Sequence, residues 1–188
     1  MTANQAFAVD ADATRQRQAV EEAVSRLGDR PEAVVLIAVG PAHTAAVKVL
    51  RERFGPWLPI YSLGQVNVED LVAKAGPGNA RGVSLTQVVP PPGSVERRIV
   101  REFNADRANY AAGTPVTYMA LEGYVAGRVL AEVMQRARPL TREGVLDAAL
   151  NAGDLEVSEF RVQYRPQLRR SMHPVDVTLI DRDGRLLR

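Results

Sequence analysis

Two short segments of the sequence combine small and polar residues in a way that suits ligand binding. Each follows an apolar run and precedes a helical pattern. The residues are Gly40, Pro41, His43 and Thr44 in the first segment, and Leu63, Gly64 and Gln65 in the second. In a parallel α/β sheet, strand carboxyl ends and the free N–H groups of the following helices meet at one edge. We therefore expect the two segments to line one crevice and to share a small ligand.

Other kinds of site find little support in the sequence. There is no phosphate loop, dinucleotide fingerprint or metal-ligand spacing, and there is no cysteine. The glycines of "AGPGNARG" follow a helical pattern and precede a strand, which is the reverse of the Rossmann order and indicates a turn. His43 and His173 could join a catalytic triad only through proximity that the sequence does not reveal. We predict no catalytic residue, no cofactor and no metal.

Composition limits the possible partners. The chain has 188 residues, 46% of them hydrophobic, and 24 basic against 22 acidic residues, for a formal charge of +2. A charge this small does not favour nucleic-acid binding. No stretch reaches the ~18 apolar residues of a membrane span, and the N-terminus lacks the features of a secretory signal. The length allows one sizeable core or two small lobes.

Strand and helix patterns alternate in the first half of the chain. Short strands are expected at Ala6–Val9, Ala33–Val39, Pro59–Ser62 and Val83–Thr86, with helices between them. The continuous apolar run Ala33–Val39 is typical of a strand covered on both faces. This order predicts an α/β fold with a mostly parallel sheet.

The character of the chain changes after three consecutive prolines. Pro90–Pro92 cannot continue a central strand and is a candidate hinge. Helices are expected at Ser94–Tyr110 and Pro115–Ala137, and Thr141 is expected to cap a third. Tyr118 begins the apolar row of the long helix, so it either packs in the core or turns its hydroxyl into a cleft. The tail is expected to close with a hairpin at "DRDGR".

The order of these pieces resembles a known family. "PEAVVLIAVGPAHTAAVKVLRERF", "PIYSLGQVNVEDLVAKAGPGNARGVSLTQVVPPP", "TYMALEGYVAGRVLAEVMQRA", "LTREGVLDAALN" and "VDVTLIDRDGRLLR" look like the C-terminal half of a type I periplasmic binding protein. The nearest group is the substrate-binding subunits of branched-chain amino acid ABC transporters. The resemblance implies a parallel Rossmann-like sheet with flanking helices and a partial two-lobe architecture. Residues 1–89 would form most of the second lobe, 90–173 the helical part and a strand of the first, and 174–188 a hairpin returning to the second.

The resemblance also implies a function. Such proteins are not enzymes; they clamp a solute between two lobes in the periplasm and deliver it to an ABC permease. By resemblance, Gly40–Thr44 would contact the solute, and Gly64 stands where amino-acid-binding members carry an acidic residue. Because the protein then lacks a side-chain carboxylate to pair with a ligand ammonium, the solute could equally be a carboxylate, an amide or an aromatic acid as an aliphatic amino acid. A cytosolic small-molecule sensor on the same fold and a small α/β enzyme are the alternatives.

One further expectation concerns exposed apolar surface. The long helix carries two adjacent apolar rows, which in the resembled family are covered by a sheet from the N-terminal half. A broad uncovered apolar face tends to find a partner. We expect the chain alone to self-associate through the 118–134 helix face or to hold its helices loosely, and to bind solute weakly.

Overall fold

Fifteen helices and strands are present in the part of the chain that the computed structural model describes, which is residues 3–165, 170–171 and 175–187. They separate into two compact units. Unit 1 comprises Met1–Gln87 and Asp176–Arg188, and unit 2 comprises Val88–Val175. Each unit has its own hydrophobic core.

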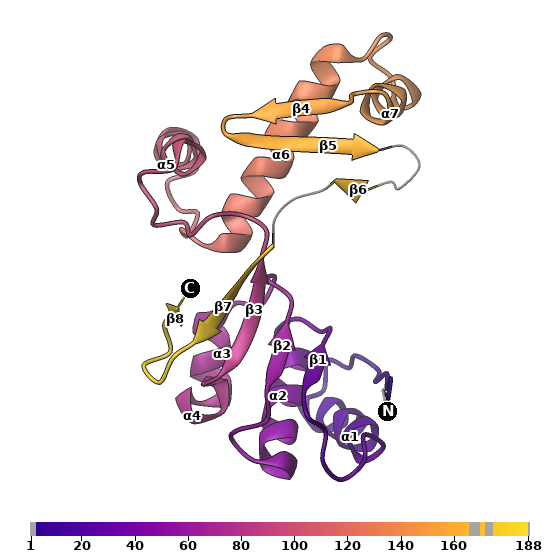
Figure 1. The fold of residues 1–188 in the computed structure, drawn as a ribbon, viewed down its shortest axis with the longest axis vertical. Helices are drawn as coiled ribbons and strands as arrows, with labels where there is room; N and C mark the ends of the chain where they lie inside the picture. Colours follow the sequence, from indigo (N-terminus) through magenta and orange to yellow (C-terminus); the bar gives the residue numbers. More distant parts are fainter. Residues whose placement is uncertain (1–2, 166–169, 172–174, 188) are drawn as a thin grey trace. The chain divides into compact units, whose positions relative to one another are not determined.

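Unit 1 alternates strands with helices along the chain. Its elements are α1 (Ala13–Ser25), β1 (Val34–Leu36), α2 (Gly40–Phe54), β2 (Ile60–Ser62), α3 (Val68–Ala75), α4 (Pro77–Ala80), β3 (Val83–Gln87), β7 (Asp176–Ile180) and β8 (Leu186–Leu187). The sheet order is β1-β2-β3-β7-β8. Strands β1 to β3 are parallel, while β7 and β8 add antiparallel strands from the end of the chain (Figure 1). The predicted α/β class and parallel βαβ order are confirmed.

The helices of unit 1 pack on one face of this sheet. Ile60, Val83 and Leu85 are fully buried beneath them, and the same core includes Val20 of α1 and Leu71 of α3. Apolar periodicity therefore places each helix where its buried stripe meets the inward-facing strand residues.

The opposite face of the sheet is open among the described residues. Val35 is 72% exposed and Ile37 is 73% exposed, so the expectation that Ala33–Val39 is covered on both faces is wrong. Alternate strand residues point to opposite faces, and only one face carries helices. One register row crosses the open face through Val35, Tyr61, Ser84, Leu179 and Leu187.

The strand expected at Ala6–Val9 does not form. These residues belong to no helix or strand ladder, although Phe7 packs against the core of unit 1. The buried side chain of Gln16 forms hydrogen bonds with backbone groups that would otherwise pair with a neighbouring strand. Its Nε2 donates to the carbonyl of Ala8 at 3.1 Å, and its Oε1 accepts from the N–H of Asp10 at 2.9 Å. A side chain thus substitutes for a strand partner.

Unit 2 consists of helices and a small antiparallel sheet. Its elements are α5 (Arg98–Tyr110), α6 (Tyr118–Arg136), α7 (Arg142–Leu150), β4 (Asp154–Val157), β5 (Phe160–Arg165) and β6 (Arg170–Ser171), with sheet order β4-β5-β6. Thr141 caps α7 as expected, since its Oγ1 accepts from the N–H of Gly144 at 3.2 Å. The long helix α6 packs against α5 and the β4–β5 hairpin through Leu121 and Val133, both buried.

Candidate functional site

The two polar segments lie at the same edge of the unit 1 sheet. Strands β1 and β2 are adjacent and parallel, with Leu36 opposite Ser62. The chain leaves β1 to begin α2 at Gly40, and leaves β2 through Leu63–Gln65 before α3 begins at Val68. The parallel order thus brings both segments to the carboxyl ends of neighbouring strands. Whether they bind a solute stays a prediction.

A buried hydrogen bond joins the first segment to the end of β2. The Nε2 atom of His43, in the first turn of α2, lies 2.9 Å from the Oγ atom of Ser62, the last residue of β2. Both side chains are buried, with His43 only 1% exposed. Burial lowers the pKa of His43 to about 4, so the imidazole is neutral at physiological pH. His43 therefore packs beneath the edge, and a contact between its side chain and a solute stays a prediction.

This histidine–serine pair lacks three properties of a catalytic dyad. A base with a pKa near 4 takes up protons poorly at neutral pH. The Nδ1 atom of His43 is buried without a hydrogen-bond partner among the described residues, so no carboxylate orients the ring there. Neither side chain is open to a substrate. The pair acts as a packing contact, and the chain's other histidine, His173, lies outside the described residues.

The start of α2 leaves backbone donors for a ligand. Gly40 has a φ of +58°, a conformation that glycine adopts without strain, and it opens the helix after Val39. No side chain caps this end, and Pro41 brings no N–H group. The Thr44 hydroxyl bonds back to the Gly40 carbonyl at 3.3 Å. A small polar group placed here would meet unsatisfied N–H groups and the positive end of the helix dipole.

The loop after β2 runs tightly over the end of β3. A Cβ atom at position 64 would overlap the carbonyl oxygen of Thr86 and would lie 3.2 Å from Oε1 of Gln87. Glycine is required here by the approach of two backbones. On either side of it, Leu63 is half-buried and Gln65 is exposed. No side chain, acidic or otherwise, fits at Gly64 in this backbone.

Tyr118 does not belong to this edge. It is the first residue of α6 in unit 2, where it is half-buried and packs against that unit's core. The core-packing alternative therefore describes its environment. A contact between its hydroxyl and a solute stays a prediction.

Three polar residues at the edge were missed by the sequence analysis. Gln87 and Thr178 are buried, and the Gln87 amide donates to the Thr178 hydroxyl at 3.4 Å. Asp176, the first residue of β7, lies opposite Gln87. Gln87 could have been found from the sequence. It is a polar residue two positions after Leu85, so strand alternation places it on the same buried face as Val83 and Leu85. The other two required knowing that β7 pairs with β3, about ninety residues earlier in the chain.

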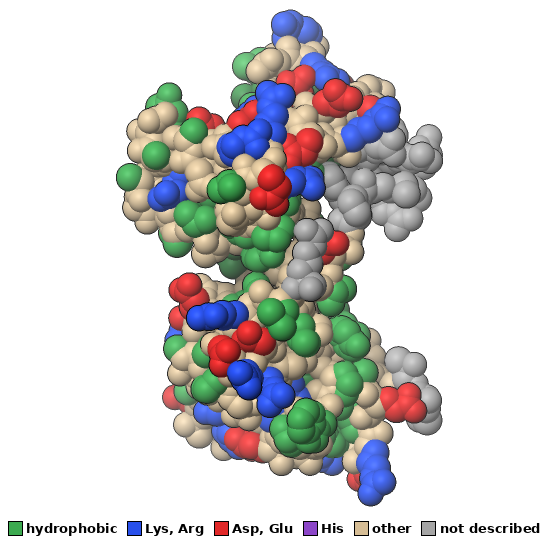
Figure 2. Space-filling model, turned by 60° about the vertical axis from the view of Figure 1, so that its left-hand side comes forward, with side chains coloured by type: hydrophobic (Ala, Val, Ile, Leu, Met, Phe, Trp, Pro, Cys, Tyr) green, Lys and Arg blue, Asp and Glu red, His purple; other side chains and the backbone are tan. Residues whose placement is uncertain are grey.

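Other kinds of site are not seen in the described part of the chain. It contains no cluster of His, Cys, Asp and Glu suited to a metal ion. None of its helices combines the length and apolar composition needed to cross a membrane. On the surface in Figure 2, acidic and basic side chains are interspersed, and no broad region of one sign is visible. The surface charge thus agrees with the small net charge of the sequence.

Comparison with known proteins places the whole arrangement in one family. Residues 6–185 match the family described as periplasmic binding protein. An extracellular ligand-binding receptor from Verminephrobacter eiseniae is similar in structure, with 23% identity, a TM-score of 0.74, and coverage of 97% of this chain and 51% of that chain. A substrate-binding periplasmic protein from Ralstonia solanacearum has 30% identity and a TM-score of 0.71, over 89% of this chain and 47% of that chain.

A possible leucine/isoleucine/valine-binding protein from Rhodopirellula baltica gives 23% identity and a TM-score of 0.69, over 84% of this chain and 43% of that chain. A search of curated proteins finds no match. The chain spans about half the length of the solved structures that it matches. The family match covers nearly the whole sequence, and the chain belongs to the periplasmic binding protein family, whose members bind solutes.

Proposed function

We propose that this chain is the solute-binding component of a branched-chain amino acid type ABC import system, acting in the periplasm and delivering a small solute to a permease. The observation that carries the proposal is the hydrogen bond between His43 and Ser62, which joins the start of α2 to the end of β2 at the carboxyl edge of a periplasmic-binding-protein sheet. Two of the similar structures, a ligand-binding receptor and a substrate-binding protein, support a binding role. Unit 1 would form most of the second lobe, and unit 2 the helical part of the first.

The proposed solute contacts follow from the accessible groups at the edge. Gly40 and Pro41 supply the backbone at the start of α2, and the Thr44 hydroxyl is half-buried beside them. Gln65 is exposed and offers an amide that both donates and accepts hydrogen bonds. Leu63 and Gly64 provide the apolar and backbone part of the wall.

The chemistry of these groups indicates the kind of solute. They are neutral, and the helix start favours negative charge. A carboxylate beside a ligand ammonium would offset the cost of removing that charge from water, yet position 64 has no room for one. We infer that the solute is recognised through a carboxylate or amide, with no essential contact to an ammonium group at position 64.

A pair of solute sets tests this proposal. Binding of branched-chain amino acids and of the 2-keto acids with the same side chains is measured by NMR titration, which detects weak binding. The keto acids are expected to bind at least as tightly as the amino acids. Amino acids that bind more than about tenfold tighter would refute the solute class. Failure of every amino, keto and aromatic acid would refute the binding function itself.

Variants then test the site. Gln65→Ala and Thr44→Val each remove one polar group and are expected to weaken binding by roughly fivefold to tenfold, the value of one hydrogen bond. Gln135→Ala, a change of an exposed glutamine in unit 2, is the matched control and should leave the affinity unchanged. Equal effects of all three variants would place the solute elsewhere.

A further inference from the structure

A buried glutamine lies against one segment of the candidate site. Gln87, the last residue of β3, is only 4% exposed. Its Oε1 atom would lie 3.2 Å from a Cβ atom placed at Gly64, and the carbonyl oxygen of Thr86 would overlap that Cβ atom. The loop after β2 therefore lies against both the backbone and the Gln87 side chain at the end of β3.

Hydrogen bonds on the other side of Gln87 fix the orientation of its amide. The Nε2 atom donates to the Thr178 hydroxyl at 3.4 Å, and that hydroxyl donates to the Leu85 carbonyl at 3.3 Å. A hydroxyl group has a single proton, so the Thr178 oxygen accepts from Gln87 and cannot also donate to it. The amide nitrogen therefore faces Thr178, which leaves Oε1 on the side of Gly64. Gln87 thus connects the loop after β2 with β7.

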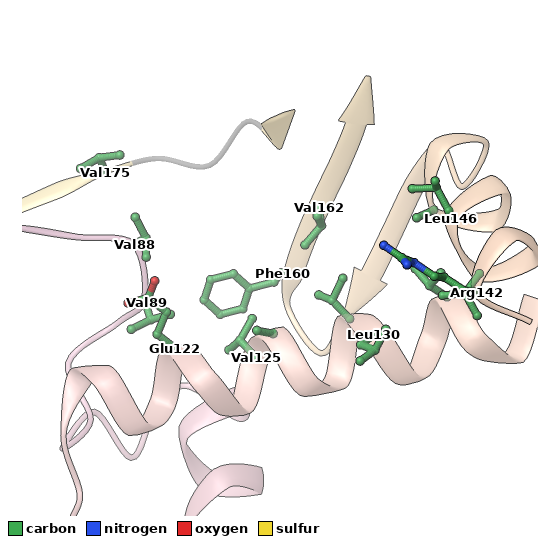
Figure 3. Close-up of a pocket in the computed structure, with 15 residues that line it drawn as sticks. Val88, Val89, Glu122, Val125, Leu130, Arg142, Leu146, Phe160, Val162 and Val175 are labelled. Atoms are coloured by element: carbon green, nitrogen blue, oxygen red, sulfur yellow. The ribbon is translucent and has the colours of Figure 1, made fainter. Parts of the chain in front are cut away.

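Gln87 also stands where the chain leaves unit 1. It lies opposite Asp176 in the ladder between β3 and β7. The next residues along the chain, Val88 and Val175, belong to unit 2, where both line an apolar groove (Figure 3). Both connections to unit 2 therefore start at one pair of opposed residues, and Gln87 lies between that pair and the loop after β2.

We propose that Gln87 is a positioning residue for solute binding: its side chain, held by Thr178, sets the position of the Leu63–Gln65 loop. The inference rests on the proposed function, because it assigns Gln87 a role in that same site. Without the bond to Thr178 the amide is free to turn, and the loop that lies against it loses a fixed neighbour. A loop without a fixed position binds solute more weakly, because binding must then order it.

Two changes at Thr178 test the proposal without altering the loop itself. Thr178→Val removes the hydroxyl and keeps the shape of the side chain, whereas Thr178→Ser keeps the hydroxyl. With branched-chain 2-keto acids as the probes, Thr178→Val should weaken binding by roughly threefold to tenfold, the value of one hydrogen bond. Thr178→Ser should bind nearly as well as the wild type. Val177→Thr, at the exposed neighbouring position of β7, is the matched control and should leave the affinity unchanged.

Amide NMR signals of the solute-free chain give a second readout that does not depend on solute binding. In Thr178→Val the signals of residues 63–65 should move, whereas Thr178→Ser should keep them at their wild-type positions. Unchanged signals from α1 show that unit 1 is still folded in both variants. Gln87→Met keeps the length of the side chain but removes the amide, and it should reproduce both effects of Thr178→Val. The double variant should add no further loss of affinity, because the two changes remove the same contact.

The outcomes separate this inference from the proposed function. Equal losses of affinity in Thr178→Val and Thr178→Ser would overturn the role of Gln87, because packing alone would then explain them. Unmoved signals at residues 63–65, moved signals with unchanged affinity, or additive losses in the double variant would also overturn it. A wild-type chain that binds no acid would refute the proposed function, and the solute-free signals would still decide whether Gln87 positions the loop.

Discussion

Gly64 and the carbonyl oxygen of Thr86 lie so close that no side chain fits between them. The contact holds the loop after β2 against the end of β3. It thereby positions one of the two segments of the candidate site. It also explains why the position carries glycine although its φ is not in the left-handed region. Glycine is needed at position 64 because the two backbones lie close together, and not because of the backbone dihedral angles at that position.

Gly64→Ala is therefore expected to lower the free energy of unfolding by about 1–3 kcal/mol, because the new methyl group forces the loop away from β3. Gly78→Ala is the matched control. Its Cβ would meet no atom within 4 Å, so stability should change by less than about 0.5 kcal/mol. Urea denaturation measures both, and equal stabilities of the two variants would contradict the packing argument.

The buried His43 predicts a pH dependence of stability. Its pKa is about 4 in the folded chain, against an ordinary value of 6.5. Below pH 6.5 the unfolded chain binds a proton that the folded chain does not. The free energy of unfolding should therefore fall as the pH drops from 6.5 toward 4, by about 2 kcal/mol at pH 5 from this residue. Well above pH 6.5 the side chain is neutral in both states and contributes no pH dependence.

Replacing the histidine isolates its contribution. His43→Gln keeps a polar side chain that can reach toward Ser62 but cannot titrate between pH 7.5 and 5. Urea denaturation across that interval should give a flatter curve for the variant than for the wild type. If the variant keeps the wild-type slope, other groups cause the acid sensitivity.

Arg51 stabilises unit 1 by joining the connection between α2 and β2 to the end of α4. Its buried guanidinium donates to the carbonyl of Leu58, to that of Asn79 at 3.1 Å and to that of Arg81 at 2.9 Å. Arg51→Lys cannot reach all three and should cost about 2–3 kcal/mol. Arg53→Lys, two residues along the same helix and exposed, should cost less than about 0.5 kcal/mol. Thermal or urea unfolding distinguishes the two, and similar losses would contradict this role.

Local patterns predicted much of the fold. The helical spacing of Ala46, Val47 and Leu50 and the break at Gly40 placed α2 correctly, and Thr141 identified the start of α7. These signals depend on residues close in sequence, so periodicity and capping suffice. The parallel βαβ order then brought the two polar loops to one edge.

Features that depend on distant pairing could not be predicted. Val35 belongs to an apolar run that suits a strand covered on both faces, and nothing local reveals that one face lacks helices. Phe7 has the pattern of a strand, but the Gln16 side chain occupies the neighbouring backbone groups. The His43 side chain bonds to Ser62, 19 residues later in the chain, and helical spacing alone does not identify that partner. Each outcome depends on tertiary contacts.

The proposed function requires that solute binds at the carboxyl ends of β1 and β2. Backbone amide shifts of the isotopically labelled chain, recorded during titration with a 2-keto acid, test it most directly. The largest shifts are expected to cluster at residues 40–44 and 63–65. Shifts confined to other residues, with those two segments unaffected at saturation, would contradict it.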